Sequence, residues 1–418
     1  MLEELTEKEF NEFSRNNKNS IFFESSYWGE LKKSTGWIYY MLGYKLENKI
    51  ICATLLLGKK IPVINKYIYY APRGFLIDYN NYDLVKEFTD GIKKFVKKNK
   101  GIFFTINPLI MYQERDINGN VIKDGINNKR VVDNLKQLGY RHVGFTKTYG
   151  KDIEPRWISV LDIKDKTIEE INNNYNKTTK WEVKDSYKHG LKLIEANEEE
   201  IEEFKKMMVH TSLRRGFVDR PLSYYQKMYQ EFKGNIKIML VELNVKENLE
   251  TYQENKEKLE EKLNFEKSKE KILENRIKEL EMQLNATNKK IEKAKELLKD
   301  SDKFIIASGL FMTFGPQVVS LFGASYKEFM NYKGQYFLNN EMIKYAIENN
   351  YEKYNFYGIT GDFSETSPMY GLFDYKRGFG AYPIELIGEF TYITNKFYNT
   401  IYNIMYKCYN LLKKVKKW

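Results

Sequence analysis

The 418-residue sequence contains few of the residues that build disulfide frameworks and metal centres. It has only two cysteines, Cys52 and Cys408, and its three histidines are isolated from one another. Two cysteines cannot make a disulfide framework, and isolated histidines do not predict a metal site. Phosphate-loop, HExxH, CxxC and GxSxG motifs are also missing. We therefore expect neither a metal nor a tightly held cofactor, so any reaction must start from an activated substrate.

Hydrophobic runs long enough to cross a bilayer are missing too. A membrane-spanning helix needs about 20 mostly apolar residues, and the first ten residues are acidic and polar rather than like a signal peptide. The sequence therefore predicts a cytoplasmic protein. Positive charge, in contrast, is in excess. The formal net charge of +11 indicates an anionic partner, which could be nucleic acid, nucleotide phosphates or a membrane surface.

The length predicts two or three domains, and two parts of the chain share one pattern of elements. In the first part we expect strands at 49–59 and 67–74, a helix at 82–98 and a strand at 101–106. The second part repeats this order, with strands at 303–313 and 318–325, a helix at 335–349 and a strand at 353–357. Ala53 matches Ala307 and Ile102 matches Tyr354, at offsets of 254 and 252 residues. The pattern predicts an internal duplication of a mixed α/β domain.

Residues 245–299 differ from both parts, because Lys, Glu and Asn dominate and Gly and Pro are absent up to residue 298. Apolar residues recur there at alternating spacings of four and three over two stretches, as in heptads. We predict an antiparallel coiled-coil hairpin roughly 30–40 Å long. Such an arm would project from the globular body, and the alternative on the pattern alone is a solvated dimerisation arm.

Two other segments are predicted to form helices with basic residues. A helix at 168–189 would carry four lysines on one face, a stripe that is most often simply solvated: Lys177, Lys180, Lys184 and Lys188. Residues 391–418 are predicted to form a basic amphipathic helix, which either docks on the core or rests on an anionic membrane. Its basic end contains Lys413, Lys414, Lys416 and Lys417 beside Trp418.

Four short strings combine aromatic and basic residues. They are Tyr27-Trp28 with Lys32 and Gly36-Trp37; Ala71-Pro72-Arg73-Gly74; Arg214-Arg215-Gly216-Phe217 with Arg220-Pro221 and Tyr224-Tyr225; and the run 370–380, which includes Tyr375-Lys376-Arg377. Each string alone is typical of an aromatic-rich surface. Together with the duplication and the hairpin, their order resembles the Fem family of peptidoglycan-bridge aminoacyltransferases over nearly the whole chain.

The resemblance implies two tandem acetyltransferase-like (GNAT) domains, the first at 1–155 and the second at 156–244 and 300–390. The hairpin at 245–299 looks like the tRNA-binding hairpin of seryl-tRNA synthetase. The implied activity is transfer of an amino acid from aminoacyl-tRNA to the stem peptide of a peptidoglycan precursor, either lipid II or UDP-MurNAc-pentapeptide. The C-terminal helix favours the lipid-linked precursor, with peripheral contact at the inner face of the membrane.

The resemblance also assigns site residues. Lys32 and Arg220 match the pair that binds the precursor's diphosphate, a suitable choice because fixed cations form short charge-assisted bonds with phosphate oxygens. Lys376 matches the catalytic position near the 3′ end of the tRNA, where a lysine could stabilise an oxyanion. The other expected substrate contacts are Tyr224, Arg73, Trp28 and Tyr375, and the expected tRNA contacts are Arg377, Lys180 and Lys184. Without the family pattern, Lys32 would be an ordinary exposed lysine, and Lys376 would keep its charge in water.

Two positions depart from the family pattern. An Asp-Pro pair that has been proposed to supply a base is Asn107-Pro108 here, and Phe322 stands where the family has a Tyr. Because Asn cannot accept a proton, we expect the acceptor amine to be deprotonated by water, by the substrate or by a carboxylate elsewhere in the chain.

Two other functions stay open on the sequence. An acyl-CoA-dependent GNAT-type N-acyltransferase would share the domains, although we find no glycine-spaced loop that would hold the coenzyme's diphosphate. A non-enzymatic RNA- or membrane-binding scaffold would share the charge and the hairpin. The sequence leaves the transferred amino acid and the oligomeric state open.

Overall fold

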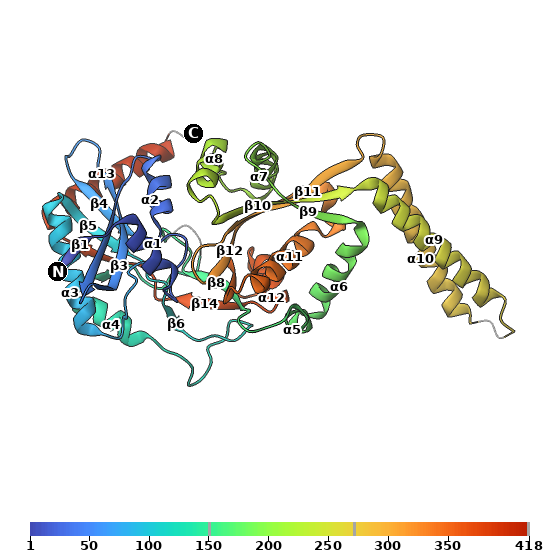
Figure 1. Cartoon of the computed structure of the whole chain (residues 1–418), viewed down its shortest axis with the longest axis horizontal. Helices are drawn as coiled ribbons and strands as arrows, with labels where there is room; N and C mark the ends of the chain where they lie inside the picture. The colour runs from blue at the N-terminus through green and yellow to red at the C-terminus, as the bar shows by residue number, and fades with distance from the viewer. Residues whose placement is uncertain (149–151, 271–272, 416–418) are drawn as a thin grey trace.

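Two mixed β-sheets form the body of the protein (Figure 1). The computed structural model describes residues 1–148, 152–270 and 273–415. The first sheet is built around β3, in which seven successive residues are buried, as expected for a strand covered on both faces. Its strands, in spatial order, are β1 (Leu2–Glu4), β2 (Ile38–Leu46), β3 (Lys49–Lys60), β4 (Tyr67–Ala71), β5 (Gly101–Ile106), β15 (Phe390–Ile393) and β7 (Arg141–His142).

The second sheet has eight strands. In spatial order they are β6 (Met111–Gln113), β14 (Tyr382–Leu386), β8 (Trp157–Asp162), β13 (Lys353–Ile359), β12 (Gln317–Ser325), β11 (Lys303–Met312), β10 (Ile236–Asn244) and β9 (Leu191–Glu195). The only parallel pair among its described strands is β12 with β13.

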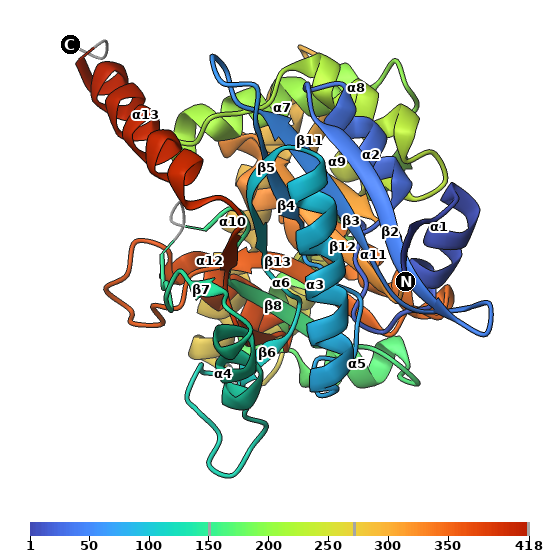
Figure 2. The same cartoon turned by 90° about the vertical axis from the view of Figure 1, so that its left-hand side faces the viewer.

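The internal duplication is confirmed at the level of topology. In the first sheet, β3 pairs antiparallel with β4, and α3 (Tyr82–Lys98) connects β4 to the parallel strand β5. In the second sheet, β11 pairs antiparallel with β12, and α11 (Gly334–Glu348) connects β12 to the parallel strand β13. Figure 2 shows α3 covering one face of the first sheet. The fold is therefore mixed α/β with two related units.

The two sheets exchange strands. β6 comes from the first half of the chain but pairs with β14 of the second sheet, and β15 comes from the C-terminal region but pairs with β5 of the first sheet. If the chain is divided at residue 155, β6 of the first half therefore lies in the second sheet, and β15 of the second half lies in the first sheet. The segment 391–418 accordingly begins in a strand, and its helix starts only at Lys396.

The prediction of one helix at 168–189 was wrong in one respect, because the segment forms two helices with a break between them. α5 ends at Asn174, Tyr175 has an extended backbone, and the Asn176 side chain caps the next helix. Asn in this position satisfies a free N–H group at a helix start, which favours a new helix over continuation.

The described helices are α1 (Glu7–Arg15), α2 (Ser26–Lys33), α3, α4 (Lys129–Gln137), α5 (Ile168–Asn174), α6 (Lys177–Ser186), α7 (Ile201–Arg215), α8 (Leu222–Glu231), α9 (Val245–Lys267), α10 (Glu274–Leu297), α11, α12 (Tyr370–Gly378) and α13 (Lys396–Val415), with short 3-10 helices at Tyr187–His189 and Lys327–Tyr332.

The pair α9 and α10 makes a helical hairpin that projects from the second sheet (Figure 1). Its apolar seam is buried between the two helices, at Leu259, Leu263 and Leu280. At its base, Tyr252 bonds through its hydroxyl to His189 Nδ1 at 2.7 Å, and Asn248 donates to the His189 carbonyl at 3.1 Å. The hairpin is therefore tied to the body by buried polar contacts as well as by packing.

One hydrophobic core is shared by the two halves of the chain. It joins Phe22 and Leu31 of the first half to Phe204, Tyr225 and Phe314 of the second. Since burying a large apolar side chain contributes about 1.5–3 kcal/mol, this shared core fixes the halves against each other. Residues at the end of α2 are thereby held close to residues at the start of α8.

Candidate active site

Lys32 lies at the C-terminal end of α2 against two indole rings. Ser25 caps the helix by accepting a hydrogen bond from the Trp28 backbone N–H at 3.2 Å. One turn later, Lys32 Nζ lies 5.2 Å from the Trp28 ring centroid and 5.6 Å from that of Trp37. Burial lowers the pKa of Lys32, and the nearby Glu154 acts in the opposite direction. Lys32 is thus a half-buried cation in a fixed place, not an ordinary exposed lysine.

Arg220 reaches the same place from the second half of the chain. α7 ends at Gly216, whose φ of 74° turns the chain, and Pro221 precedes the first residue of α8. The Arg220 guanidinium carbon lies 5.5 Å from the Tyr224 ring centroid. The charge of Arg220 lowers the pKa of Lys32, as expected for two neighbouring cations. The structure therefore brings Lys32, Arg220, Tyr224 and Trp28 together.

A carboxylate that the sequence analysis missed lies beside both cations. Glu154 Oε2 accepts a hydrogen bond from the Tyr357 hydroxyl at 2.5 Å. Burial raises the pKa of Glu154, whereas the positive charges of Arg73, Lys32 and Arg220 act to lower it. The string around Glu154 matches no motif, and Tyr357 is about 200 residues away, so no sequence signal could have found this pair.

Arg73 and Asn107 form the inner wall of the site. Arg73 is 2% exposed, and its Nη2 donates to the Pro155 carbonyl at 2.9 Å. Asn107 Oδ1 accepts hydrogen bonds from the Arg73 backbone N–H at 2.8 Å and from the Tyr70 hydroxyl at 3.1 Å. The oxygen of Asn107 is therefore used to fix the Arg73 loop.

The ammonium group of Lys376, on α12, lies inside the protein. Its Nζ donates to the carbonyl oxygens of Phe356 at 2.6 Å and Gly358 at 2.8 Å, and it lies 3.4 Å from that of Tyr357. Burial lowers the pKa of Lys376 to about 7, although bonds to carbonyl oxygens favour the protonated form. The alternative in which Lys376 keeps its charge in water was wrong, since the residue is only 7% exposed.

Tyr357 links Lys376 to the cations of the first half. The pairing of β13 with β8 shifts register between Asn355 and Tyr357, and Tyr357 has a φ of 62°. Asn355 Oδ1 accepts a hydrogen bond from the Tyr357 backbone N–H at 2.8 Å. Such a bulge re-aims a side chain, and here it turns the Tyr357 hydroxyl to Glu154. Lys376 holds the backbone on both sides of this residue.

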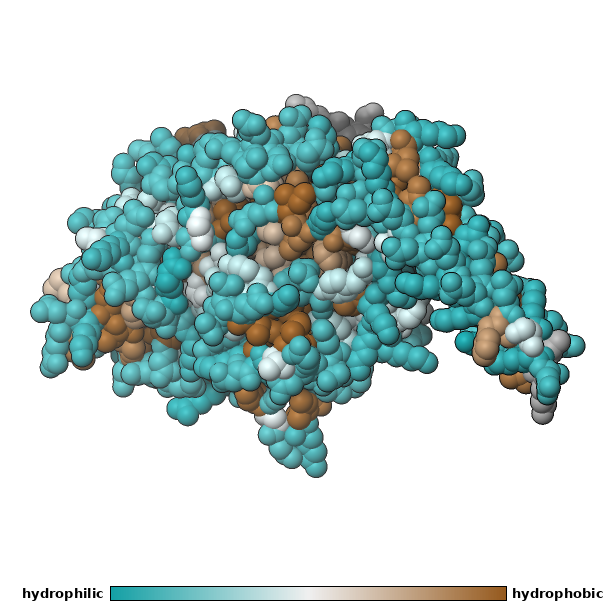
Figure 3. Space-filling view, turned by 45° about the vertical axis from the view of Figure 1, so that its right-hand side comes forward, coloured by the Kyte–Doolittle hydropathy of each residue, from teal (hydrophilic) through white to brown (hydrophobic). Residues whose placement is uncertain are grey.

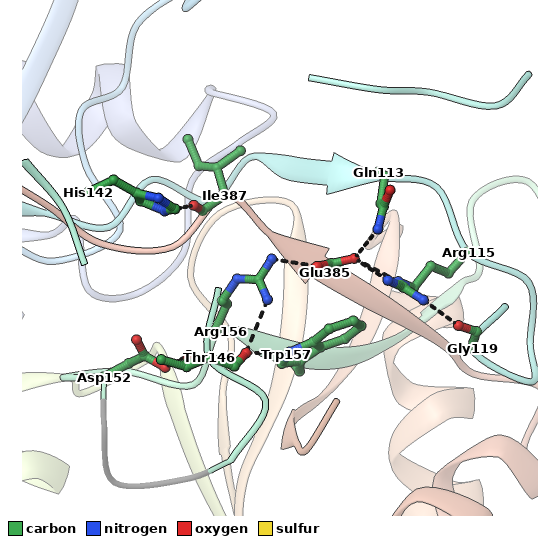
Figure 4. A network of polar contacts seen from close by, with 10 residues as sticks. All are labelled: Gln113, Arg115, Gly119, His142, Thr146, Asp152, Arg156, Trp157, Glu385 and Ile387. Atoms are coloured by element: carbon green, nitrogen blue, oxygen red, sulfur yellow. Dashed lines mark hydrogen bonds and ion pairs between the residues drawn. The ribbon is translucent and has the colours of Figure 1, made fainter. Parts of the chain in front are cut away.

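The chain next to Glu154 is held by a buried ion network (Figure 4). Glu385 of β14 pairs with Arg156 at 2.5 Å and with Arg115 at 2.6 Å. Arg156 and Trp157 both donate to the Thr146 carbonyl, at 3.0 and 2.9 Å. A buried pair is stable only when its remaining hydrogen bonds are made, so this network fixes Arg156 and the start of β8.

Glu154 borders two hollows. One is a cavity of about 210 Å³, whose lining includes Lys147, Asp152, Trp157 and Ile359. The other is a narrow crevice that Arg73, Asn107 and Glu389 also line. Burial raises the pKa of Glu389 to about 7.

The remaining predicted residues lie apart from this group. The Tyr375 hydroxyl donates to the Gln335 carbonyl and accepts from Asn339, both at 3.0 Å. Arg377 pairs with Asp374 at 2.5 Å. Lys180 and Lys184 are exposed on α6. Since the Asn176 N–H donates to the Gly378 carbonyl at 2.9 Å, α6 begins beside the end of α12, and the expected tRNA contacts lie on adjoining helices. Their roles stay predictions.

Comparisons with known proteins find relatives that match nearly the whole chain. A model of the FemAB family matches residues 5–413. The aminoacyltransferase FemA of Staphylococcus epidermidis is 34% identical over 425 residues, covering 99% of each chain. FemA of Staphylococcus aureus strain N315 is 32% identical over 420 residues, covering 99% of this chain and 98% of the relative. The crystal structure of FemX superposes with a TM-score of 0.77 at 27% identity, covering 96% of this chain and 99% of FemX.

The duplicated mixed α/β fold and these relatives place the chain in the class of aminoacyltransferases. Within that class, the chain is a member of the FemAB family.

Proposed function

We propose that this protein acts in the cytoplasm and transfers an amino acid from aminoacyl-tRNA to the stem peptide of a lipid-linked peptidoglycan precursor. The observation that carries the proposal is the meeting of Lys32 and Arg220, from opposite halves of the chain, at Glu154 and Tyr357. Two cations held in place suit a diphosphate. An aminoacyl ester is already activated, so the protein needs chiefly to orient it, to favour loss of the amine's proton and to stabilise the oxyanion.

The placement of positive charge indicates where tRNA phosphates would bind. Residues 245–299 contain 14 Lys and Arg but 13 Glu, a net charge of +1, so that +10 of the total +11 lies on the rest of the chain. The visible surface of the hairpin is accordingly hydrophilic, with small apolar patches (Figure 3). We therefore expect phosphate contacts on α6 of the body, with the hairpin contributing orientation more than affinity.

Reversing two charges on α6 is expected to weaken the use of tRNA. Lys180→Glu with Lys184→Glu should raise KM for aminoacyl-tRNA about tenfold and reduce the salt dependence of tRNA binding, because two phosphate contacts are lost. Transfer of a labelled amino acid from tRNA to the precursor is the assay, and Lys344→Glu, an exposed lysine on α11, is the matched control. Loss of transfer with unchanged tRNA binding would contradict this placement.

The same assay examines the hairpin. Replacing residues 245–299 by a short linker is expected to lower transfer. The oligomeric state, measured by the mass of the protein in solution, should stay the same. If the deletion instead abolished self-association, the hairpin would be a dimerisation arm.

The lipid-linked form of the precursor is supported by apolar residues exposed along one edge of the molecule. Three residues at heptad spacing on α13 point to solvent: Phe397, Ile404 and Leu411 are 69%, 57% and 63% exposed. Lys66 lies 4.4 Å from the Tyr398 ring centroid, so the β3–β4 loop, with Val63 96% exposed, is next to α13. In both views α13, α7 and α8 lie along the upper edge (Figures 1 and 2). This pattern suits contact with a membrane surface.

The end of α7 and the loop that leads from it to Arg220 have the same character. Leu213 on α7 and Val218 in the loop are 80% and 96% exposed, and Arg214 and Arg215 end the helix. A diphosphate bound at Arg220 would therefore lie close to a surface suited to lipid. No described helix is long and apolar enough to span a bilayer, so the contact would be peripheral. Lys416, Lys417 and Trp418, which end the predicted basic helix, lie outside the described residues.

Removing apolar side chains from α13 is expected to release the protein from membranes. Phe397→Ser with Ile404→Ser should weaken binding to vesicles that contain anionic lipid at least tenfold. Full burial of one such side chain contributes about 1.5–3 kcal/mol, so even half of that for each of the two exceeds the ~1.4 kcal/mol of a tenfold change. Cosedimentation with the vesicles is the measurement. Leu46→Ser is the control. Leu46, the last residue of β2, is 63% exposed and pairs with Lys49 at the start of β3, whereas the loop with Val63 follows the end of β3. Equal release by both variants would contradict a docking role for α13.

A further inference from the structure

Asn107 leaves this chain without a carboxylate where the family pattern has one, and the structure places another carboxylate, Glu154, in the lining of the same crevice. Asn107 is 3% exposed, and its Nδ2 has no hydrogen-bond partner among the described residues. Glu154 lines the crevice with Asn107 and also borders the larger cavity. We propose that Glu154 accepts the proton of the acceptor amine, in place of a carboxylate at residue 107. The proposal rests on the aminoacyl transfer proposed above.

Other acidic groups nearby are less suited to this task. Glu389 Oε1 accepts a hydrogen bond from the Ile153 N–H, and Asp152 Oδ2 accepts one from the Thr146 hydroxyl. The main influences on the pKa of Glu389 are its burial, the Ile153 hydrogen bond and the charges of Asp152, Arg73 and Glu154. Glu154, in contrast, is influenced by both Lys32 and Arg220 and is bonded to Tyr357 of the second sheet. It therefore lies where a precursor bound at its diphosphate would approach the second domain.

The charged and titratable groups that face Glu154 come from every element around it. They are Lys32 at the end of α2, Tyr70 and Arg73 of β4 and its loop, Arg220 and Tyr224 at the start of α8, Tyr357 of β13, and Glu389 before β15. Asp152 and Arg156 line both hollows with Glu154, and Lys147 lines the larger one. The cations and the Tyr357 hydroxyl lower the pKa of Glu154, and burial, the largest influence, raises it.

This arrangement couples the basicity of Glu154 to acceptor binding. A diphosphate seated on Lys32 and Arg220 would neutralise two of the three cations that lower the pKa of Glu154, while its burial is retained. The pKa of Glu154 would then rise towards that of an amine, which improves it as a proton acceptor. The carboxylate is thus strengthened only when the acceptor is in place.

The proton balance of the step is complete. Glu154 takes one proton from the acceptor ammonium and passes it to water, and the free amine attacks the ester carbonyl of the aminoacyl-tRNA. The new C–N bond forms, the bond between the carbonyl carbon and the ribose oxygen breaks, and the second proton lost by the nitrogen ends on that ribose oxygen. The overall reaction gives an amide, tRNA with a free hydroxyl and one proton.

The test compares three full-length variants with the wild-type protein. Glu154→Gln keeps the shape of the side chain and an acceptor for the Tyr357 hydroxyl, and it should lower kcat about 100- to 1,000-fold at pH 7 with little change in KM for the precursor. The defect should shrink as pH rises, because more of the amine is free without a base. The double variant Glu154→Gln with Asn107→Asp should have a kcat at least tenfold higher than that of Glu154→Gln alone. Tyr357→Phe should shift the acidic limb of the kcat profile to higher pH, because a hydrogen bond that lowers the pKa of Glu154 is lost.

Two results would overturn the proposal. One is a Glu154→Gln protein that keeps kcat within threefold of wild type with an unchanged pH profile. The other is a rise in KM for the precursor with kcat intact, which would make Glu154 a binding residue. Failure of the wild-type protein to transfer from any charged tRNA would be a different result, since it would remove the proposed function itself.

Discussion

Replacing both Lys32 and Arg220 by alanine is expected to lower kcat/KM for a diphosphate-bearing precursor about 1,000-fold. A hydrogen bond to a charged group contributes about 1.5–3 kcal/mol, so the loss of two corresponds to roughly 100- to 10,000-fold. The diphosphate lies away from the reacting amine, so it is bound equally in the ground and transition states. The loss should therefore appear in KM, with kcat changed little.

Two controls separate this effect from damage to the fold. Lys33→Ala removes the neighbouring lysine, whose side chain is 63% exposed and pairs with Glu30 at 3.4 Å, and it should leave kcat/KM near the wild-type value. A free stem peptide without the diphosphate should be used by the doubly substituted protein at least as well as by the wild type, because no diphosphate contact is lost and two cations that lower the pKa of Glu154 are removed. If the double variant lost activity on that peptide as well, Lys32 and Arg220 would not act through the diphosphate.

Lys376→Met should cost both activity and stability. Three carbonyl oxygens of β13 lose their shared donor, and each buried acceptor left without a partner costs about 1–3 kcal/mol. The backbone around Tyr357 would no longer be held, so we expect kcat to fall about 100-fold or more and the free energy of unfolding to fall by about 3 kcal/mol. Transfer kinetics and unfolding in guanidinium chloride are the measurements, with Lys344→Met as the control on an exposed part of the same domain.

Lys376 also makes stability depend on pH in a direction that can be checked. Its pKa is about 7 in the folded protein and about 10.4 in an unfolded chain, so between these values the unfolded state binds more protons. Stability therefore rises with pH across this window, and below pH 7 both states are protonated and the effect is constant. The Met variant should lack this rise. A wild-type protein whose stability relative to the Met variant fell between pH 7 and pH 10 would contradict a buried ammonium with a lowered pKa.

Local pattern was enough to predict the duplication, because strands and helices of this kind depend on short-range periodicity. The runs that became β3 and β11 are apolar enough to specify buried strands, and the four-three spacing of 245–299 specified two helices. The break at Asn176 was missed because the lysine stripe suits a continuous helix, whereas a capping bond and the contact with Gly378 favour two. The strand exchange of β6 and β15 depends on pairings between residues up to about 290 positions apart, which no local pattern encodes.

The site divides in the same way. The charged and aromatic strings around Lys32, Arg220 and Lys376 could be recognised from the order of the residues alone, because a resemblance in motif order requires nothing more. That Glu154 and Tyr357 join them follows from the folded chain, because a bulge in β13 aims the Tyr357 side chain and a buried ion network fixes Arg156 next to Glu154. The tertiary structure also decided the state of Lys376, since whether a lysine is a surface charge or a buried donor depends on how much water the folded chain excludes from it.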